Sequence, residues 1–172
     1  MTAERTLPAA ALALTATVAV STALVAFGNI TDFGTNEEFV RHVLAMDTTF
    51  QDPDLMWRAI TDHALQDAVY VAIIAWETAA ALVLLAATVQ WVRGLAGRTL
   101  GHGRARRLTT VGLVMLLLLF GLGFMAIGGE WFAMWQSSKW NGLDAATREV
   151  LLAGITLLLV QLPSPRWGVG VP

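Results

Sequence analysis

The residue whose type and position most clearly suggest chemistry is Glu77, an acidic side chain inside an apolar run. It lies about ten residues into the stretch 68–92, which places it about 15 Å along a helix and near the centre of a bilayer. An ionised carboxylate at that depth costs about 2.5–3.5 kcal/mol on insertion scales, so it needs a partner. Two interpretations stay open: Glu77 clamps helices together, or it contacts a proton path, a cofactor or a bound lipid.

Polar residues on the apolar runs are the candidate partners of Glu77. Tyr70 precedes it by seven residues and therefore shares its helical face, and Trp76 is its neighbour in sequence. Ser21 and Thr22 on the first apolar run lie at a comparable depth, counted from the outer end of that run. The sequence therefore predicts a polar contact between two helices at this level.

A second acid, Glu130, follows two glycines at the outer end of the third apolar run. Charge costs less near the interface, so its position is less informative than that of Glu77. We expect Glu130 to pair with Arg148 or Arg58 and to tie the loops together. The alternative is that Glu130 and Arg58 help to line a pocket around Glu77.

His42 and His63 lie in an acidic segment outside the apolar runs and are further candidates for binding a ligand or a partner. A haem inside the membrane would need histidines at mid-depth on the spanning helices, and there are none. Nearby acids could join the two histidines at a metal, but no pair of ligands has a diagnostic spacing. We therefore expect no metal and no cofactor, and a bound lipid is compatible with the sequence.

The elements that must position these side chains are long apolar runs. The chain has 172 residues, of which 56% are hydrophobic and only 14% are charged, against about 25% charged in a soluble domain. Four runs, about 8–28, 68–92, 108–129 and 146–162, approach the length of about 20 residues that a membrane-spanning helix needs. The sequence predicts one membrane domain over 1–172, an all-α integral membrane protein with a four-transmembrane-helix bundle.

The charges between these runs predict an orientation. Five arginines and no acid lie in 93–107, whereas 29–67 carries eight acids and two arginines. Because basic loops stay inside, we expect a bacterial inner-membrane protein with 93–107 and both termini in the cytoplasm. The arginines could also bind RNA, but their place beside two spans and the slightly acidic net charge of −2 favour topology. The first run exceeds the 7–15 residues of a signal-peptide core, so we expect a retained anchor.

The two outer loops, 29–67 and 130–145, are expected to form a helical extracytoplasmic cap. A capping box in Thr35-Asn-Glu-Glu38 predicts the start of an amphipathic helix. Asp52-Pro53-Asp54 predicts a short helix over 55–60, and Thr61-Asp62 predicts the cap of the second span.

Tryptophans recur in the second outer loop at Trp131, Trp135 and Trp140. The first interpretation is an interfacial belt, because indole rings favour the headgroup level of a bilayer. The second is an aromatic platform that docks a partner or a flat ligand. Both interpretations place this segment beside the first outer loop, so that the two loops form a cap on the outer surface, where we expect the function to lie.

Several strings in this chain resemble those of a known family. They are Gly28-Asn-Ile-Thr-Asp-Phe-Gly-Thr-Asn36, His42-Val-Leu-Ala-Met-Asp-Thr-Thr-Phe50, Met56-Trp-Arg-Ala-Ile60, Ala75-Trp-Glu77 and Ile127-Gly-Gly-Glu-Trp-Phe-Ala-Met-Trp-Gln136. The chain resembles, over nearly its whole length, the bacterial "predicted small integral membrane protein" family, a domain of unknown function. The resemblance implies a four-span protein and brings no activity with it.

The absence of a phosphate loop and of a hydrolase nucleophile elbow favours a non-enzymatic role. The first hypothesis is an accessory or assembly subunit of a larger membrane complex, for example a respiratory or other redox enzyme. It would dock on a membrane protein or on a second copy through the outer cap and helix faces, with no nucleic acid involved. The alternative is a small binding or transport protein with a pocket under the cap around Glu77. A metal-dependent enzyme using the outer histidines is the third hypothesis.

Overall fold

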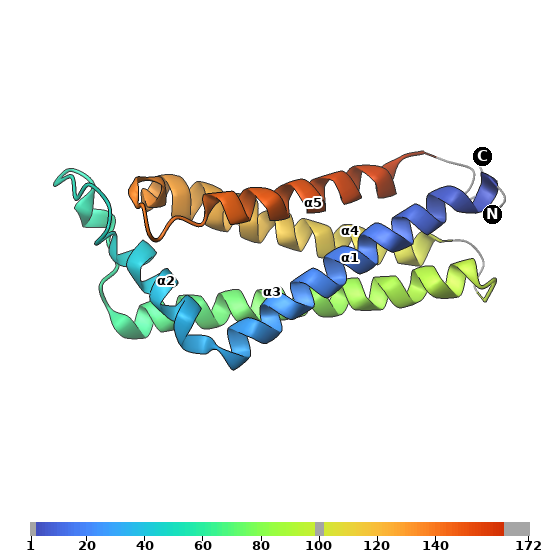
Figure 1. Ribbon diagram of the computed structural model, residues 1–172, viewed down its shortest axis with the longest axis horizontal. Coiled ribbons are helices and arrows are strands. Elements are labelled where there is room, and N and C mark those ends of the chain that lie inside the picture. Colours follow the sequence, from blue (N-terminus) through green and yellow to red (C-terminus); the bar gives the residue numbers. More distant parts are fainter. Residues whose placement is uncertain (1–2, 99–101, 164–172) are drawn as a thin grey trace.

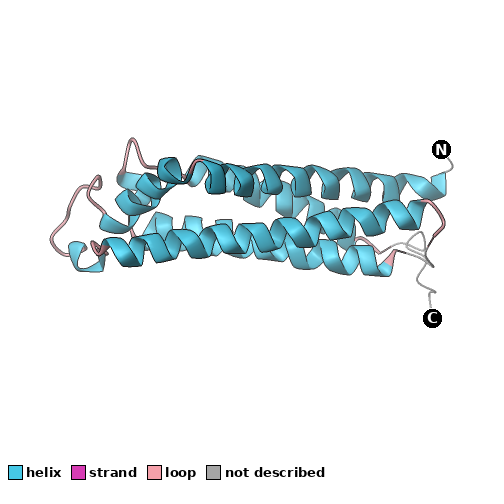
Figure 2. Ribbon diagram, turned by 90° about the horizontal axis from the view of Figure 1, so that it is seen from below, coloured by secondary structure: helices cyan, strands magenta, loops and turns pink. Residues whose placement is uncertain are grey.

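The computed structural model describes residues 3–98 and 102–163, and every regular element within them is helical. Parts of the expected cytoplasmic regions, namely residues 1–2, 99–101 and 164–172, lie outside the described residues. The long elements are α1 (Ala3–Thr31), α3 (His63–Leu95), α4 (Gly103–Leu117), its continuation η2 (Leu118–Trp131) and α5 (Leu143–Gln161). They lie side by side and alternate in direction along the long axis (Figures 1 and 2).

Three helical segments are long and apolar enough to cross a membrane, Thr6–Thr31, His63–Leu95 and Gly103–Trp131. The second of these, α3, has 33 residues and is about 50 Å long at 1.5 Å per residue, more than the hydrocarbon thickness of about 30 Å. Helix α5 is not among the three, and its first seven residues include Asp144, Arg148 and Glu149. The described residues thus contain three candidate spans.

Small residues bring the long helices together. Ala19, Ala80 and Ala153 are fully buried in one apolar cluster of the interior. At Gly112 the backbone of α4 approaches α3 so closely that an added Cβ would lie 2.6 Å from Leu84 Cγ. Such close approach is the usual basis of helix association in a membrane, where lipid is as apolar as the helix surfaces.

At the end of the bundle opposite the N-terminus, α2 (Phe33–Ala45) follows α1 after a single residue (Figure 1). The helix begins at Phe33, so the expectation that the Thr35 motif caps its start is wrong. The Asp32 N–H donates to the Gly28 carbonyl at 2.8 Å, which continues the α1 hydrogen-bond pattern through the junction. The Thr35 hydroxyl instead donates to the Asp32 carboxylate at 2.9 Å.

The remaining segments at this end, 46–62 and 132–142, are called the loop end. They contain only two short 3₁₀ turns, η1 (Met56–Arg58) and η3 (Met134–Gln136), so the helix expected over 55–60 is a single turn. The predicted cap of α3 is confirmed, since Asp62 Oδ1 accepts a hydrogen bond from the Leu65 N–H at 2.8 Å. The loop end and α2 therefore cover the same end of α3 and η2 (Figure 1).

Candidate functional site

The polar centre of the bundle is a chain of hydrogen bonds that joins α1, α2 and α3. Asn29 Nδ2 donates to Glu77 Oε2 at 2.7 Å, and Asn36 Nδ2 donates to Asn29 Oδ1 at 2.6 Å. The Tyr70 hydroxyl donates to the backbone oxygen of Asn29 at 3.4 Å. These four residues are called the Asn29–Glu77 cluster. Asn29 is 6%, Glu77 3% and Tyr70 1% exposed, so these three residues are buried, whereas Asn36 is exposed.

The carboxyl group of Glu77 has no cationic partner among the described residues. The ion pairs that the described residues form are Arg41–Glu37, Arg41–Asp67 and His42–Asp47. Asn29 is the described residue that donates to the carboxyl group, and its Nδ2 donates to Oε2 and not to Oε1. An ionised carboxylate buried in this way is stabilised by one amide only, which leaves its charge largely uncompensated.

Two adjoining cavities lie beneath α2. The polar cavity has a volume of about 230 Å³ and is lined by all four residues of the cluster, together with Phe120, Phe124 and other apolar residues. The apolar cavity, of about 200 Å³, lies between α2, α3 and η2 and has an almost wholly hydrocarbon lining. Both cavities are bordered by Phe39, Val40, Ile73 and Phe124. Each is somewhat smaller than a typical small-molecule site of about 300–1,000 Å³, and the shared walls place the two next to each other.

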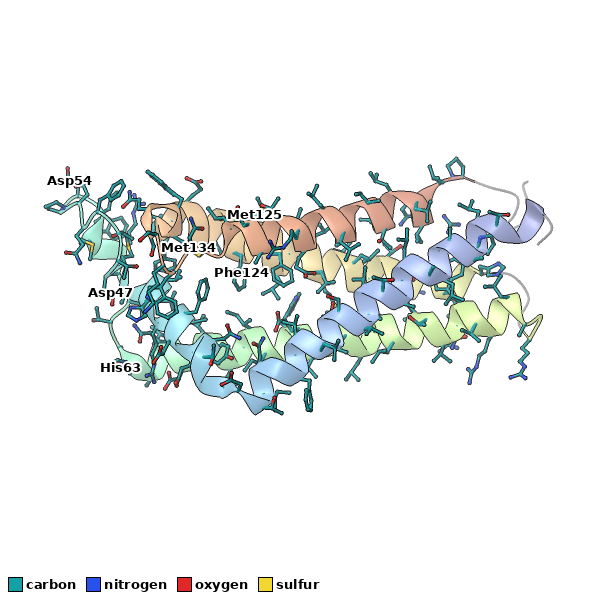
Figure 3. All side chains as sticks on the ribbon, in the orientation of Figure 1. Asp47, Asp54, His63, Phe124, Met125 and Met134 are labelled. Atoms are coloured by element: carbon teal, nitrogen blue, oxygen red, sulfur yellow. The ribbon has the colours of Figure 1, made fainter. Side chains whose placement is uncertain are left out.

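The wall of the apolar cavity on the η2 side is an unusually wide helix. The Phe132 N–H donates to the Ile127 carbonyl at 3.0 Å, five residues back, which is the hydrogen bond of a π-helix. Such turns are rare and occur frequently at functional sites. Gly123 and Gly128 line the cavity without a side chain, and Phe124 and Met134 lie between η2 and α2 (Figure 3).

A polar groove of about 640 Å³ lies on the other side of α2, at the loop end, and both predicted histidines border it. His42 Nδ1 lies 2.8 Å from Asp47 Oδ2, and the ring of His42 stacks on Trp140 with 4.6 Å between centroids. His63 and Asp47 are both found at this end in Figure 3. The described residues contain no group of three or more acids and histidines that could hold a metal ion.

Exposed aromatic side chains gather at the tip of the loop end. The guanidinium of Arg58 lies 4.7 Å from the ring centroid of Trp131, and its Nη1 donates to the Trp131 carbonyl at 3.3 Å. The Trp57 ring meets Trp131 edge-on at 5.5 Å, and Phe50 meets Trp135 in the same way at 5.9 Å. The predicted residues Arg58, Trp131 and Trp135 therefore belong to this surface, and none of them borders the cavities around Glu77.

Of the residues expected around Glu77, only some lie beside it in the structure. Tyr70 lines the polar cavity with it. Trp76 does not, because its indole N–H donates to the Met115 carbonyl of α4 at 2.9 Å and its side chain is 42% exposed. Glu130 is exposed at the end of η2, and no ion pair joins it to Arg58 or Arg148 within the described chain.

The expected partners of Glu77 on the first span were wrong. The Thr22 hydroxyl donates to the Val18 carbonyl of its own helix at 2.9 Å, and Asn29 takes the place that depth counting gave to Ser21 and Thr22. Helix α1 ends two residues after Asn29, yet its end meets α3 at Glu77, well inside that helix. The signal that could have found this partner is an asparagine at the end of an otherwise apolar run.

The long apolar helices and the intramembrane acid define the class of the molecule, an integral membrane protein with three candidate spans. A family model described as "Predicted small integral membrane protein (DUF2165)" matches residues 7–163, and the chain belongs to this family. Searches of the curated proteins and of the solved structures each found no match.

Proposed function

We propose that this protein binds a small amphiphilic molecule of the membrane in the two cavities beneath α2. The observation that carries the proposal is the position of Glu77: its side chain is 3% exposed, it lines the polar cavity, and no described residue donates to its Oε1. A carboxyl group that served only to clamp α1 to α3 would need no cavity beside it. A polar end next to an apolar chamber is the usual composition of a small-molecule site.

A test of this proposal is native mass spectrometry of the protein purified from its own membrane in mild detergent. We expect a non-covalent adduct of small-molecule mass that Glu77→Gln loses, since the amide keeps the bond from Asn29 but removes the charge. Glu130→Gln is the matched control, because Glu130 is exposed and borders neither cavity. A wild-type protein without any adduct, with Glu77→Gln changing thermal stability alone, would make Glu77 a clamp and refute the proposal.

The proposal includes a place in the membrane, with α5 as a fourth span. Helix α5 has 19 residues, about 28 Å at 1.5 Å per residue, and its charges fall in its first turns at the loop end. Its sides contact α1, α4 and η2. The arginines of 93–107 support a cytoplasmic position for that loop and for both termini, at a bacterial inner membrane. The loop end and α2 would then form the extracytoplasmic cap.

The chain contains no cysteine, so this topology can be tested with single introduced thiols. Ser138→Cys lies at the loop end and Gly103→Cys at the start of α4, and both positions are exposed. A membrane-impermeant maleimide should label Ser138→Cys in spheroplasts with an intact inner membrane, and Gly103→Cys only after that membrane is opened. The reverse pattern would contradict the proposed orientation. Labelling of both would contradict the single span, Gly103–Trp131, that separates the two positions.

The aromatic tip favours a second candidate function, that of an accessory or assembly subunit. Trp57 is 70% and Phe50 72% exposed there, and Trp131 and Trp135 add two further half-exposed rings. Such rings are enriched in protein interfaces, and they also suit the headgroup level of a bilayer. Weighing the particle in mild detergent separates the two: a larger complex or homo-oligomer supports a subunit role, and a solitary monomer counts against it.

A further inference from the structure

The lining of the polar cavity restricts the chemistry of its ligand. Besides the carboxyl group of Glu77, four aromatic rings border this space, those of Phe39, Tyr70, Phe120 and Phe124. Phe120 and Phe124 lie 5.4 Å apart with tilted planes, and Phe39 stacks on Phe124 at 6.3 Å. The carboxyl group therefore belongs to a chamber with aromatic walls.

Both features of this chamber attract positive charge. The face of an aromatic ring carries a negative potential, and rings arranged around a site are a known means of binding quaternary ammonium groups. A buried carboxylate has the same preference, since an opposite charge offsets its loss of hydration. An anionic head group would meet unfavourable electrostatics at this position.

No basic residue is among the described residues that line the polar cavity. Arg41 on α2 and Lys139 in the loop end border the polar groove on the opposite side of α2. Arg41 is held there by Glu37 at 3.0 Å and Asp67 at 2.9 Å, and Lys139 lies over the Trp140 ring at 4.6 Å. Arg148 lies on α5, whose Ala145 and Ala146 line the cavity, but Arg148 is not a lining residue and no ion pair joins it to Glu77 among the described residues. A ligand bound in the cavity would supply the positive charge that suits Glu77.

A bare metal cation fits this chamber poorly. Hard cations such as Ca²⁺ and Mg²⁺ take about six or more oxygen ligands, whereas the side chains that line the cavity offer one carboxyl, two amides and one phenol among apolar groups. The adjoining apolar cavity, beyond Phe39 and Phe124, provides space for a hydrocarbon group.

We infer that the ligand is a hydrophobic organic ammonium ion. Its charged nitrogen lies beside Glu77 and the aromatic rings, and its hydrocarbon part extends past Phe39 and Phe124 into the apolar cavity. This inference rests on the proposed function and adds the sign of the charge and the chemical class of the ligand.

The test compares two probes of the same shape, phenyltrimethylammonium and its uncharged carbon isostere tert-butylbenzene. Each is titrated calorimetrically into the full-length protein in detergent micelles, with protein-free micelles as the reference for partitioning. We expect the cation to bind more tightly than the hydrocarbon. Glu77→Gln should weaken binding of the cation about tenfold or more and leave the hydrocarbon within about twofold.

The aromatic contribution is measured with Phe124→Leu, which keeps an apolar side chain at that position. The ratio of the two affinities should fall by about two- to thirtyfold, the range that cation–π contacts span. Glu130→Gln should leave both affinities unchanged, because Glu130 is exposed and lines neither cavity.

The outcomes distinguish failure of the ammonium inference from failure of the proposed function. If the wild-type protein binds tert-butylbenzene as tightly as the cation, the ammonium inference is overturned and the proposed function stands. If neither probe binds, both are overturned. The wild-type comparison needs no variant, so it decides the question even if Glu77→Gln proves unstable, and circular dichroism of each variant checks its helix content.

Discussion

The Asn29–Glu77 hydrogen bond should be the polar contact on which the association of α1 with α3 most depends. The perturbation is Asn29→Ala, which removes the donor to Glu77 Oε2 at 2.7 Å and the acceptor for Asn36 at 2.6 Å. The bond from Tyr70 goes to the backbone and is retained. The variant thus leaves the buried carboxyl group of Glu77 and the exposed amide of Asn36 without their partner.

The size of the expected loss in the free energy of unfolding depends on the burial of the two residues and on the membrane environment. Hydrogen bonds to charged groups contribute about 1.5–3 kcal/mol in proteins, but double-mutant cycles between membrane helices average about 0.6 and reach about 1.7 kcal/mol. Since both residues are at least nine-tenths buried, we expect a coupling near the upper membrane value, about 1.5 kcal/mol. The bond to Asn36 brings the total loss for Asn29→Ala to about 2 kcal/mol.

The assay is a double-mutant cycle of Asn29→Ala and Glu77→Ala, with the free energy of unfolding obtained by titrating detergent-solubilised protein with dodecyl sulfate. Thr31→Ala is the control, because its hydroxyl bonds the Phe27 carbonyl of its own helix and its side chain is exposed. A coupling below about 0.5 kcal/mol, or an effect of Asn29→Ala no larger than that of Thr31→Ala, would refute this account of the cluster.

Three further predictions concern packing and the covering helix. Gly112→Ala should lower the free energy of unfolding by about 1–3 kcal/mol, because its Cβ would lie 2.6 Å from Leu84 Cγ. Gly154→Ala has open space around its Cβ and should be neutral or stabilising by up to about 1 kcal/mol. Thermal unfolding compares the two variants, and equal effects would contradict the close packing of α4 on α3 at Gly112. Gly128→Ala should keep the fold, since its Cβ would lie 3.5 Å or more from its neighbours. The added methyl group fills part of the apolar cavity, so the affinity for tert-butylbenzene measured by calorimetry should fall. An unchanged affinity would mean that the hydrocarbon binds elsewhere. Arg41→Met should weaken the packing of α2 on α3 by about 0.5–1 kcal/mol, because the ion pair with Asp67 is lost. The backbone amides of α2 should then exchange hydrogen faster. In the wild-type protein, 1 M salt should produce part of the same increase, because it screens the ion pair.

The sequence predicted the long helices because their determinants are local and additive. An apolar run of sufficient length must satisfy its own backbone hydrogen bonds in lipid, so 8–28, 68–92 and 108–129 could be read directly as helices. The cap at Asp62 was also predictable, because a carboxylate before the first turn acts on an amide three residues away. The charges at the start of α5 made the fourth run less distinct in composition.

The partner of Glu77 could not be predicted because it depends on how two helices are offset. Counting depth from the outer ends assumes that the end of α1 and the start of α3 lie at the same level. In the structure α1 ends beside the middle of α3, and the chain continues as α2. The capping box at Thr35 failed for a related reason, since Asp32 continues the α1 hydrogen bonds and the next helix starts at once. The cavities depend further on the π-helical backbone of η2, which no residue pattern in 118–131 specified.

The central claim is that the cavity beside Glu77 holds a molecule other than protein. The most direct measurement is a high-resolution density map of the protein purified from its own membrane. We expect density between Glu77 and Phe124 that extends past Phe39 toward Met134, with an atom within hydrogen-bonding or ion-pairing distance of Glu77 Oε1. A map in which protein side chains fill this space, and in which Glu77 hydrogen-bonds to protein groups alone, would contradict the claim.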